Sequence, residues 1–165
     1  MKKLACIALA AAFLVVSTPA EEVQAQVAFG PQAVLWDFDD LGVGARVDWN
    51  MGEAFEIDEG FFENLTGSFN ANYVFDDFND ATTLIFNINA HVPFDIDAGV
   101  TPFAGTGINH YRISVDGPFS FSGSGLNLLG GIMFGLGDIP AFTELQYSTT
   151  GAGFISLSFG VLFGG

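Results

Sequence analysis

Apolar and polar residues alternate along much of this chain with a period of two, which indicates β-strands whose two faces differ. In residues 41–50, every second residue is apolar, and the residues between them are polar or glycine. The apolar positions are Leu41, Val43, Ala45, Val47 and Trp49. The same alternation recurs in residues 68–75, 83–94 and 155–163. Each of these segments therefore has one apolar face and one face of mainly small or polar residues.

Four less regular segments, residues 27–38, 101–113, 126–136 and 141–148, complete a set of eight predicted strands. Residues 27–38 fit either parity, whereas the pattern of residues 101–113 groups Thr106, His110 and Arg112 on the polar face. The connections have turn and charge signals, with 39–40, 76–80, 115–125 and 149–152 alternating with 52–65, 95–99 and 137–140. No repeat or linker divides the strands, so one domain is expected.

The composition of the polar faces indicates which face points outward. In a soluble barrel or sandwich the apolar face points inward and a charged face meets water. Here the polar faces hold mainly Gly, Ser, Thr and Asn, while most acidic residues lie in the connections. Such faces suit the packed interior of a narrow barrel. In lipid, only a closed barrel provides hydrogen-bond partners for the backbone N–H and C=O groups of every strand. We therefore predict an all-β fold, an eight-stranded antiparallel up-and-down transmembrane β-barrel; a soluble exported β-barrel or sandwich is the alternative.

The N-terminus has the features of a cleavable signal peptide. Met1-Lys2-Lys3 is basic, and the thirteen apolar residues that follow, 4–16, are shorter than the roughly 20 that a membrane-spanning helix needs. Cleavage is expected after Ala25, or alternatively after Ala20. Residues 1–25 are thus the predicted signal peptide and residues 26–165 the barrel domain. The only cysteine, Cys6, lies in the signal peptide, so the exported chain does not rely on disulfides.

The composition and net charge of the chain disfavour some classes of function. The chain of 165 residues is 50% hydrophobic and has a net charge of −15, with only four Lys and Arg residues. Nucleic-acid binding is disfavoured, because neutralising phosphates requires clusters of basic residues. No apolar run after the N-terminus is long enough for a spanning helix. The apolar residues are therefore expected to be distributed around the wall of the barrel.

Four motifs, in this order, give the chain a family resemblance. They are Pro102-Phe103-Ala104-Gly105-Thr106-Gly107, the strand and turn of residues 130–138, Glu144-Leu145-Gln146-Tyr147, and Phe159-Gly160-Val161-Leu162-Phe163. With the signal peptide, they resemble the small outer-membrane β-barrels of Gram-negative bacteria, of the OmpA transmembrane domain, OmpX and opacity-protein type.

The resemblance implies a monomer in the cell outer membrane, with both termini in the periplasm and the connections near residues 39, 78, 118 and 150 outside. Its implied partners are outer-membrane lipids, lipopolysaccharide and, during biogenesis, the barrel-assembly machinery. Family members commonly end on an aromatic residue, whereas here Phe163 is followed by two glycines.

Several polar side chains fall on the predicted lumen faces. Because an eight-stranded barrel is just wide enough inside for side chains, we expect a packed polar network rather than an open pore. A confined charge needs a partner, so either Arg46 or Arg112 is expected to pair with Glu144. The network would be structural, or alternatively a gate for a small conductance. Its predicted members are Arg46, Asp48, His91, His110, Arg112, Glu144 and Gln146.

The sequence favours neither catalysis nor a cofactor. A serine and a histidine on one strand face would lie two positions apart, but Val92-Pro93 follows His91 and Tyr111-Arg112 follows His110. Acidic connections offer carboxylates to a divalent cation that could bridge to lipopolysaccharide, although they could equally be solvated loops. These candidates are Asp39, Asp40, Asp76, Asp77 and Asp80.

The function predicted from the sequence is that of a non-enzymatic outer-membrane β-barrel protein, which contributes to envelope integrity or surface interaction and whose lumen is plugged by polar side chains. One alternative is a narrow porin-like channel for small or hydrophobic solutes. Another is a soluble exported β-barrel that binds a small ligand.

Overall fold

The computed structural model describes residues 27–57, 59–60, 62–76, 81–94, 96, 99–115 and 120–164. The predicted signal peptide, residues 1–25, lies outside the described residues and stays a prediction. Within the described ranges the chain forms eight strands and one short helix. They are β1 (Val27–Trp36), β2 (Asp40–Asn50), α2 (Met51–Ala54), β3 (Thr66–Asp76), β4 (Ala81–Pro93), β5 (Val100–Ser114), β6 (Ser120–Leu136), β7 (Ile139–Ser148) and β8 (Phe154–Val161).

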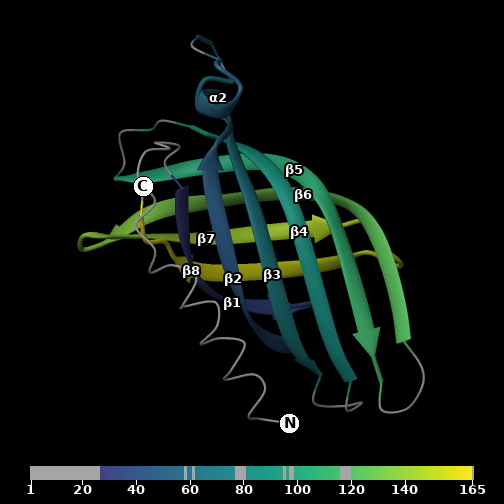
Figure 1. The fold of residues 1–165 in the computed structure, drawn as a ribbon. Helices are drawn as coiled ribbons and strands as arrows, with labels where there is room; N and C mark the ends of the chain where they lie inside the picture. Colours follow the sequence, from purple (N-terminus) through teal and green to yellow (C-terminus); the bar gives the residue numbers. More distant parts are fainter. Residues whose placement is uncertain are drawn as a thin grey trace, which may run out of the picture.

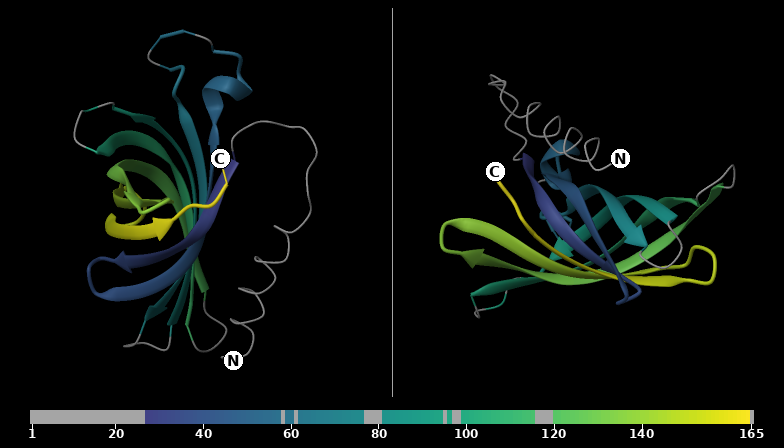
Figure 2. Two further views of the ribbon diagram at one scale, coloured as in Figure 1. Left: turned by 90° about the vertical axis from the view of Figure 1, so that its left-hand side faces the viewer. Right: turned by 90° about the horizontal axis from the view of Figure 1, so that it is seen from below.

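The strands form a closed barrel in which each pairs antiparallel with its neighbours in sequence (Figures 1 and 2). The barrel closes where β1 pairs with β8, with Gln32 opposite Gly160 and Trp36 opposite Ser156. Beyond β8 the closure extends to Phe163, whose backbone exchanges two hydrogen bonds with that of Phe29, at 2.9 and 2.7 Å. The predicted eight-stranded, antiparallel, up-and-down topology is confirmed.

Seven connections join the strands and alternate between the two ends of the barrel. The α2 end holds the β2–β3 connection, the β4–β5 connection and the β6–β7 turn, together with the start of β1 and the C-terminus (Figure 1). The opposite end holds the other four connections. We refer to it as the four-turn end. No helix among the described residues is long and apolar enough to cross a membrane.

The β1–β2 connection is a tight turn in which two residues adopt the left-handed region. Asp37 has a φ of 49° and Phe38 a φ of 60°, and the Asp39 N–H donates to the Trp36 carbonyl at 3.1 Å. Two positive φ angles in succession are the signature of a type I′ turn, whose twist matches that of the flanking strands. The turn therefore sets the register of the first hairpin.

One predicted connection is wrong in extent. Residues 120–125 were expected to belong to a long connection, because residues 115–125 have turn and charge signals, but they form the start of β6. Their partners on β5 are Asn109–Ser114. Pairing with an adjacent strand thus overrides the local preference, and β5 and β6 become the longest strands, at 15 and 17 residues.

Candidate functional site: the lumen and the outer face of the barrel

The lumen is filled by three successive layers of side chains. The layer nearest the four-turn end is apolar: Val34, Val74 and Ile85 form a buried cluster against which Trp36 and Tyr111 pack. Phe154 meets the Trp36 ring edge-on, with 5.4 Å between ring centroids. Aromatic rings in this arrangement pack closely, so this layer is an apolar cluster inside the four-turn end of the barrel.

Sequence reasoning missed this apolar layer for two reasons. Val34 lies in the segment whose parity was undecided, and Val74 and Phe154 lie at the end and the start of their strands. One signal was present, because Ile85 stands between Thr83 and Asn87 on a face that is otherwise polar. An apolar residue on the lumen face indicates that the lumen is filled by apolar side chains at that level.

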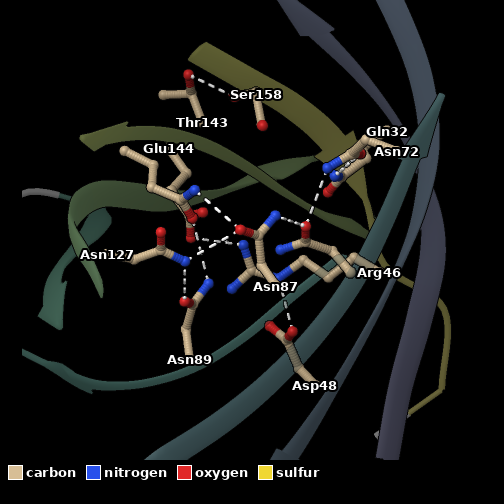
Figure 3. Close-up of polar contacts among 12 residues, drawn as sticks. Gln32, Arg46, Asp48, Asn72, Asn87, Asn89, Asn127, Thr143, Glu144 and Ser158 are labelled. Atoms are coloured by element: carbon tan, nitrogen blue, oxygen red, sulfur yellow. Dashed lines mark hydrogen bonds and ion pairs between the residues drawn. The ribbon is translucent and has the colours of Figure 1, made fainter. Parts of the chain in front are cut away.

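The middle layer is a network of side-chain amides that crosses the lumen (Figure 3). Asn87 is its centre: its Nδ2 donates to Asn70 Oδ1 at 2.6 Å, and its Oδ1 accepts from Asn127 Nδ2 at 3.0 Å and from Gln146 Nε2 at 3.1 Å. Asn127 Nδ2 also donates to Asn89 Oδ1 at 2.9 Å. Because each amide has both donors and an acceptor, amides can form such a network without any charge.

The third layer, nearer the α2 end, contains the buried charges. Arg46 Nε donates to Asp48 Oδ1 at 2.6 Å, and Arg46 Nη1 donates to Glu144 Oε2 at 2.7 Å, which joins β2 to β7 across the lumen. Arg46 is only 1% exposed. Its guanidinium carbon also lies 4.4 Å from the centroid of the Phe142 ring. One cation thus holds two carboxylates in a space without bulk water, where an unpaired charge would be very costly.

The charged layer is less completely hydrogen-bonded than the amide layer. Among the described residues, Arg46 Nη2, Asp48 Oδ2 and both ring nitrogens of His91 have no hydrogen-bond partner. The His91 ring lies instead against the Phe103 ring, with 4.7 Å between centroids. Buried polar groups without partners carry a desolvation penalty, so the two ion pairs of Arg46 are offset in part by these atoms.

The structure places Arg46, Asp48, His91, Glu144 and Gln146 on the lumen face, where all five are buried. It brings Arg46 together with Glu144, one of the two pairings that the sequence left open. Arg46 also bonds to Asp48, its same-face neighbour on β2. His91 makes no hydrogen bond with these side chains.

Two lumen predictions are wrong, because His110 and Arg112 lie on the outer face of β5. Their partners on β4 are Phe86 and Leu84, both exposed to the outside. Asn109 is the inward residue here, at 3% exposed. The expected parity rested on the polarity of His110 and Arg112, since Gly105 and Gly107 have no side chain to indicate a face. A pair between Arg112 and Glu144 is therefore excluded.

The acidic residues proposed for cation binding are mostly beyond what the structure describes. Asp77 and Asp80 lie outside the described residues, as does the side chain of Asp76, while Asp39 is exposed in the β1–β2 turn and Asp40 opens β2. Within the described part of the chain, no group of three or more His, Cys, Asp or Glu side chains could hold a metal ion. Cation binding by these connections stays a prediction.

The outer face of the barrel is a broad apolar surface. On every strand the side chains that point away from the lumen include exposed apolar residues, and some are very open, such as Leu128 at 68%. An exposed apolar surface of this extent marks contact with lipid or with another protein. Its large members include Leu41, Val43, Phe69, Tyr73, Leu84, Phe86, Ile88, Ile108, Leu126, Leu128, Leu145, Tyr147, Leu157 and Phe159.

No protein-family model matches the chain, and no curated protein matches it in sequence. Solved structures do match. Neisserial surface protein A has 15% identity and a TM-score of 0.59 over 82% of this chain and 94% of its own. The N-terminal β-barrel domain of Pseudomonas aeruginosa OprF has 14% identity and a TM-score of 0.57 over 85% of this chain and 100% of its own.

A third match is Ail, the attachment invasion locus protein of Yersinia pestis, with 18% identity and a TM-score of 0.53 over 84% of this chain and 97% of its own. These three are small outer-membrane barrels. At such identities the likeness concerns the fold: this chain has the fold of the small eight-stranded outer-membrane barrels.

Proposed function

We propose that this protein is an outer-membrane β-barrel without enzymatic activity, which contributes to envelope integrity or surface interaction and whose lumen is closed by its own side chains. The observation that carries the proposal is the division between its two surfaces, apolar outside and packed with polar side chains inside. Seven of the described strands have 10 to 17 residues, and the 8-residue β8 is extended by the Phe29–Phe163 bridge. These lengths suit the task, because a tilted strand spans a bilayer with about 9–11 residues.

A soluble ligand-binding barrel is disfavoured by the same division. Such a protein would expose a polar exterior and keep an apolar cavity inside, whereas here Leu126, Leu128 and Ile108 are each more than half exposed. The predicted signal peptide and the fold of the matched structures both support export to the outer membrane. In that position the α2 end would face the periplasm and the four-turn end the exterior.

Planar-bilayer recording on the purified protein tests whether the lumen is closed. We expect no steady unitary conductance from the wild type, because the apolar layer and the hydrogen-bonded amide network both lie across the lumen. Steady conductance from the wild type would contradict this proposal.

The second candidate function is a narrow channel gated by the charged layer. The observation that favours it is the incomplete hydrogen bonding of Arg46 and Asp48, which lowers the cost of rearranging their contacts. If the layer is a gate, Glu144→Ala should conduct where the wild type does not, and Leu145→Ala, an outward-facing neighbour, should not. No conductance in any of the three proteins would exclude the gate.

The absence of catalysis needs its own test, because His110 and Ser124 meet on the outer face. The distance from His110 Nδ1 to Ser124 Oγ is 2.9 Å, across the β5–β6 pair. Because the contact joins two strands, the spacing of residues within one strand does not predict it. No carboxylate within the described residues orients the imidazole, as general-base activation of a serine usually requires.

We therefore expect the wild type and Ser124→Ala to release equally little fatty acid from phospholipid vesicles, matching protein-free vesicles. Release by the wild type that Ser124→Ala abolishes would show an esterase and overturn the non-enzymatic proposal.

A further inference from the structure

The outer face of the β5–β6 hairpin changes character along its length. Ile108 on β5 and Leu126 on β6 face each other in the apolar region. At the next outward pair, His110 and Ser124 replace them, and Arg112 and Ser122 follow toward the hairpin end. The adjacent strand β4 continues apolar at Phe86, which pairs with His110. A polar patch thus borders an apolar surface on this side of the barrel.

A hollow of about 450 Å³ lies at this border. It crosses the outer face of neighbouring strands, and the hydrogen bond to Ser124 holds the His110 ring at its edge. The hollow is lined mainly by large apolar side chains, and His110 and Ser124 are among its polar residues, so it can take a hydrocarbon chain whose polar end lies toward His110. Its side-chain lining includes Phe69, Phe86, Ile88, Ile108, His110 and Leu126.

Arg112 places a positive charge beside this hollow, one outward position beyond His110 on the same strand. The sequence has only two arginines, and Arg46 is buried in the lumen. Arg112 makes no ion pair with any described residue, and its partner on β4 is the apolar Leu84. An arginine at the edge of a lipid-facing surface extends its charge toward the headgroups. Its planar guanidinium can donate two parallel hydrogen bonds to one phosphate.

We propose that Arg112, His110 and the adjoining hollow form a binding site for one lipid whose headgroup bears a phosphate. Arg112 binds the phosphate with two N–H groups, His110 borders it, and an acyl chain lies in the hollow between Phe86 and Leu126. The proposal rests on the proposed membrane position of the barrel, and it assigns a role to the two residues that sequence reasoning had placed in the lumen.

Native mass spectrometry of the refolded, detergent-solubilised protein tests this site with two probes, lipid A carrying its phosphates and the same lipid A after enzymatic removal of both. We expect Arg112→Gln to weaken binding of the phosphorylated probe about tenfold, the equivalent of one charge-assisted contact. Removing the phosphates should weaken binding to the wild type by a similar factor and have little further effect on Arg112→Gln.

Three controls separate this site from general adhesion of lipid. Arg112→Lys keeps the charge and should retain part of the affinity, whereas Ser114→Gln, the next outward position, should bind as the wild type does. Millimolar inorganic phosphate should not displace the lipid, because it cannot occupy the hollow; displacement would indicate a site for free phosphate and overturn the lipid assignment.

Each way of failing has a distinct meaning. Equal binding of both probes, or equal binding by the wild type and Arg112→Gln, contradicts the site. If every variant keeps heat-modifiable migration on SDS gels, that contradiction leaves the proposed outer-membrane function intact. A wild type that folds without detergent or lipid, stays in the aqueous phase and binds neither probe contradicts the inference and the proposed function together.

Discussion

At the scale of single residues, Arg46 is the side chain on which the lumen depends most. It pairs with Asp48 and Glu144 at 2.6 and 2.7 Å while its guanidinium lies over the Phe142 ring. A buried charge is expensive to leave without its partner, yet a complete ion cluster can often be exchanged for apolar residues at little cost. These two cases give opposite expectations for mutations at the same place.

We expect Glu144→Leu alone to lower the free energy of unfolding by about 3–5 kcal/mol, because Arg46 then keeps only Asp48 as a partner. The triple change Arg46→Met, Asp48→Leu and Glu144→Leu should restore most of that loss. Urea titration of the refolded barrel in lipid vesicles, followed by tryptophan fluorescence, measures both. A triple variant that is less stable than Glu144→Leu would contradict the view that the unpaired charge causes the loss.

Among the connecting elements, the β1–β2 turn contains one residue whose backbone conformation is strained. Phe38 has a φ of 60°. This value lies in the left-handed region, which glycine adopts readily and in which a bulky residue is strained. Asp37 is also left-handed, but its Oδ1 accepts a hydrogen bond from the Ile155 N–H at 2.9 Å, which ties the turn to β8.

Phe38→Gly should therefore raise the free energy of unfolding by about 1 kcal/mol through relief of strain. Asp37→Gly is the matched control, and it should gain less or lose stability because it gives up the side-chain hydrogen bond from Ile155 N–H while keeping the backbone bond to the Ile155 carbonyl. The same urea titration compares the two. Equal gains from both changes would show that the side-chain hydrogen bond from Ile155 N–H to Asp37 contributes nothing.

Much of the arrangement of strands could be predicted, because alternation is strong wherever large side chains occupy both faces. On β2, Leu41 and Val43 lie on one face and Arg46 lies on the other, so the sequence alone indicates which residues share a face. The parity of β5 could not be predicted, since Gly105 and Gly107 leave the lumen face without a side chain and His110 and Arg112 suggested the wrong one. The contacts of Asn87 depend on three other strands, and local pattern contains no information about them.

Cysteine labelling tests the corrected parity of β5. The described barrel has no native cysteine, so single replacements can be read individually. Arg112→Cys and His110→Cys should react with a maleimide added to the folded protein in detergent, while Asn109→Cys, at a position only 3% exposed, should react at least tenfold more slowly until the barrel is unfolded. Fast labelling of Asn109→Cys with protection of the other two would restore the parity expected from the sequence.

At the scale of the whole molecule, two surfaces of opposite character share one sheet. The closed ladder satisfies the backbone of every strand, so the outer face can be apolar throughout. The interior is occupied by apolar, amide and charged side chains in turn. The polar border at His110 and Arg112 is then the one place on the outer face of β5 where a lipid headgroup is expected to be bound by side chains.

A closed β-barrel in the outer membrane has two properties that can be measured together, its cellular fraction and its resistance to SDS. The most direct measurement is the migration of the protein on SDS gels, with and without boiling, after separation of periplasm from outer membranes. We expect the protein in the outer-membrane fraction, with unboiled and boiled samples migrating differently because the closed barrel resists SDS until it is heated. Recovery in the periplasmic supernatant, with a single migration position in both samples, would contradict the account.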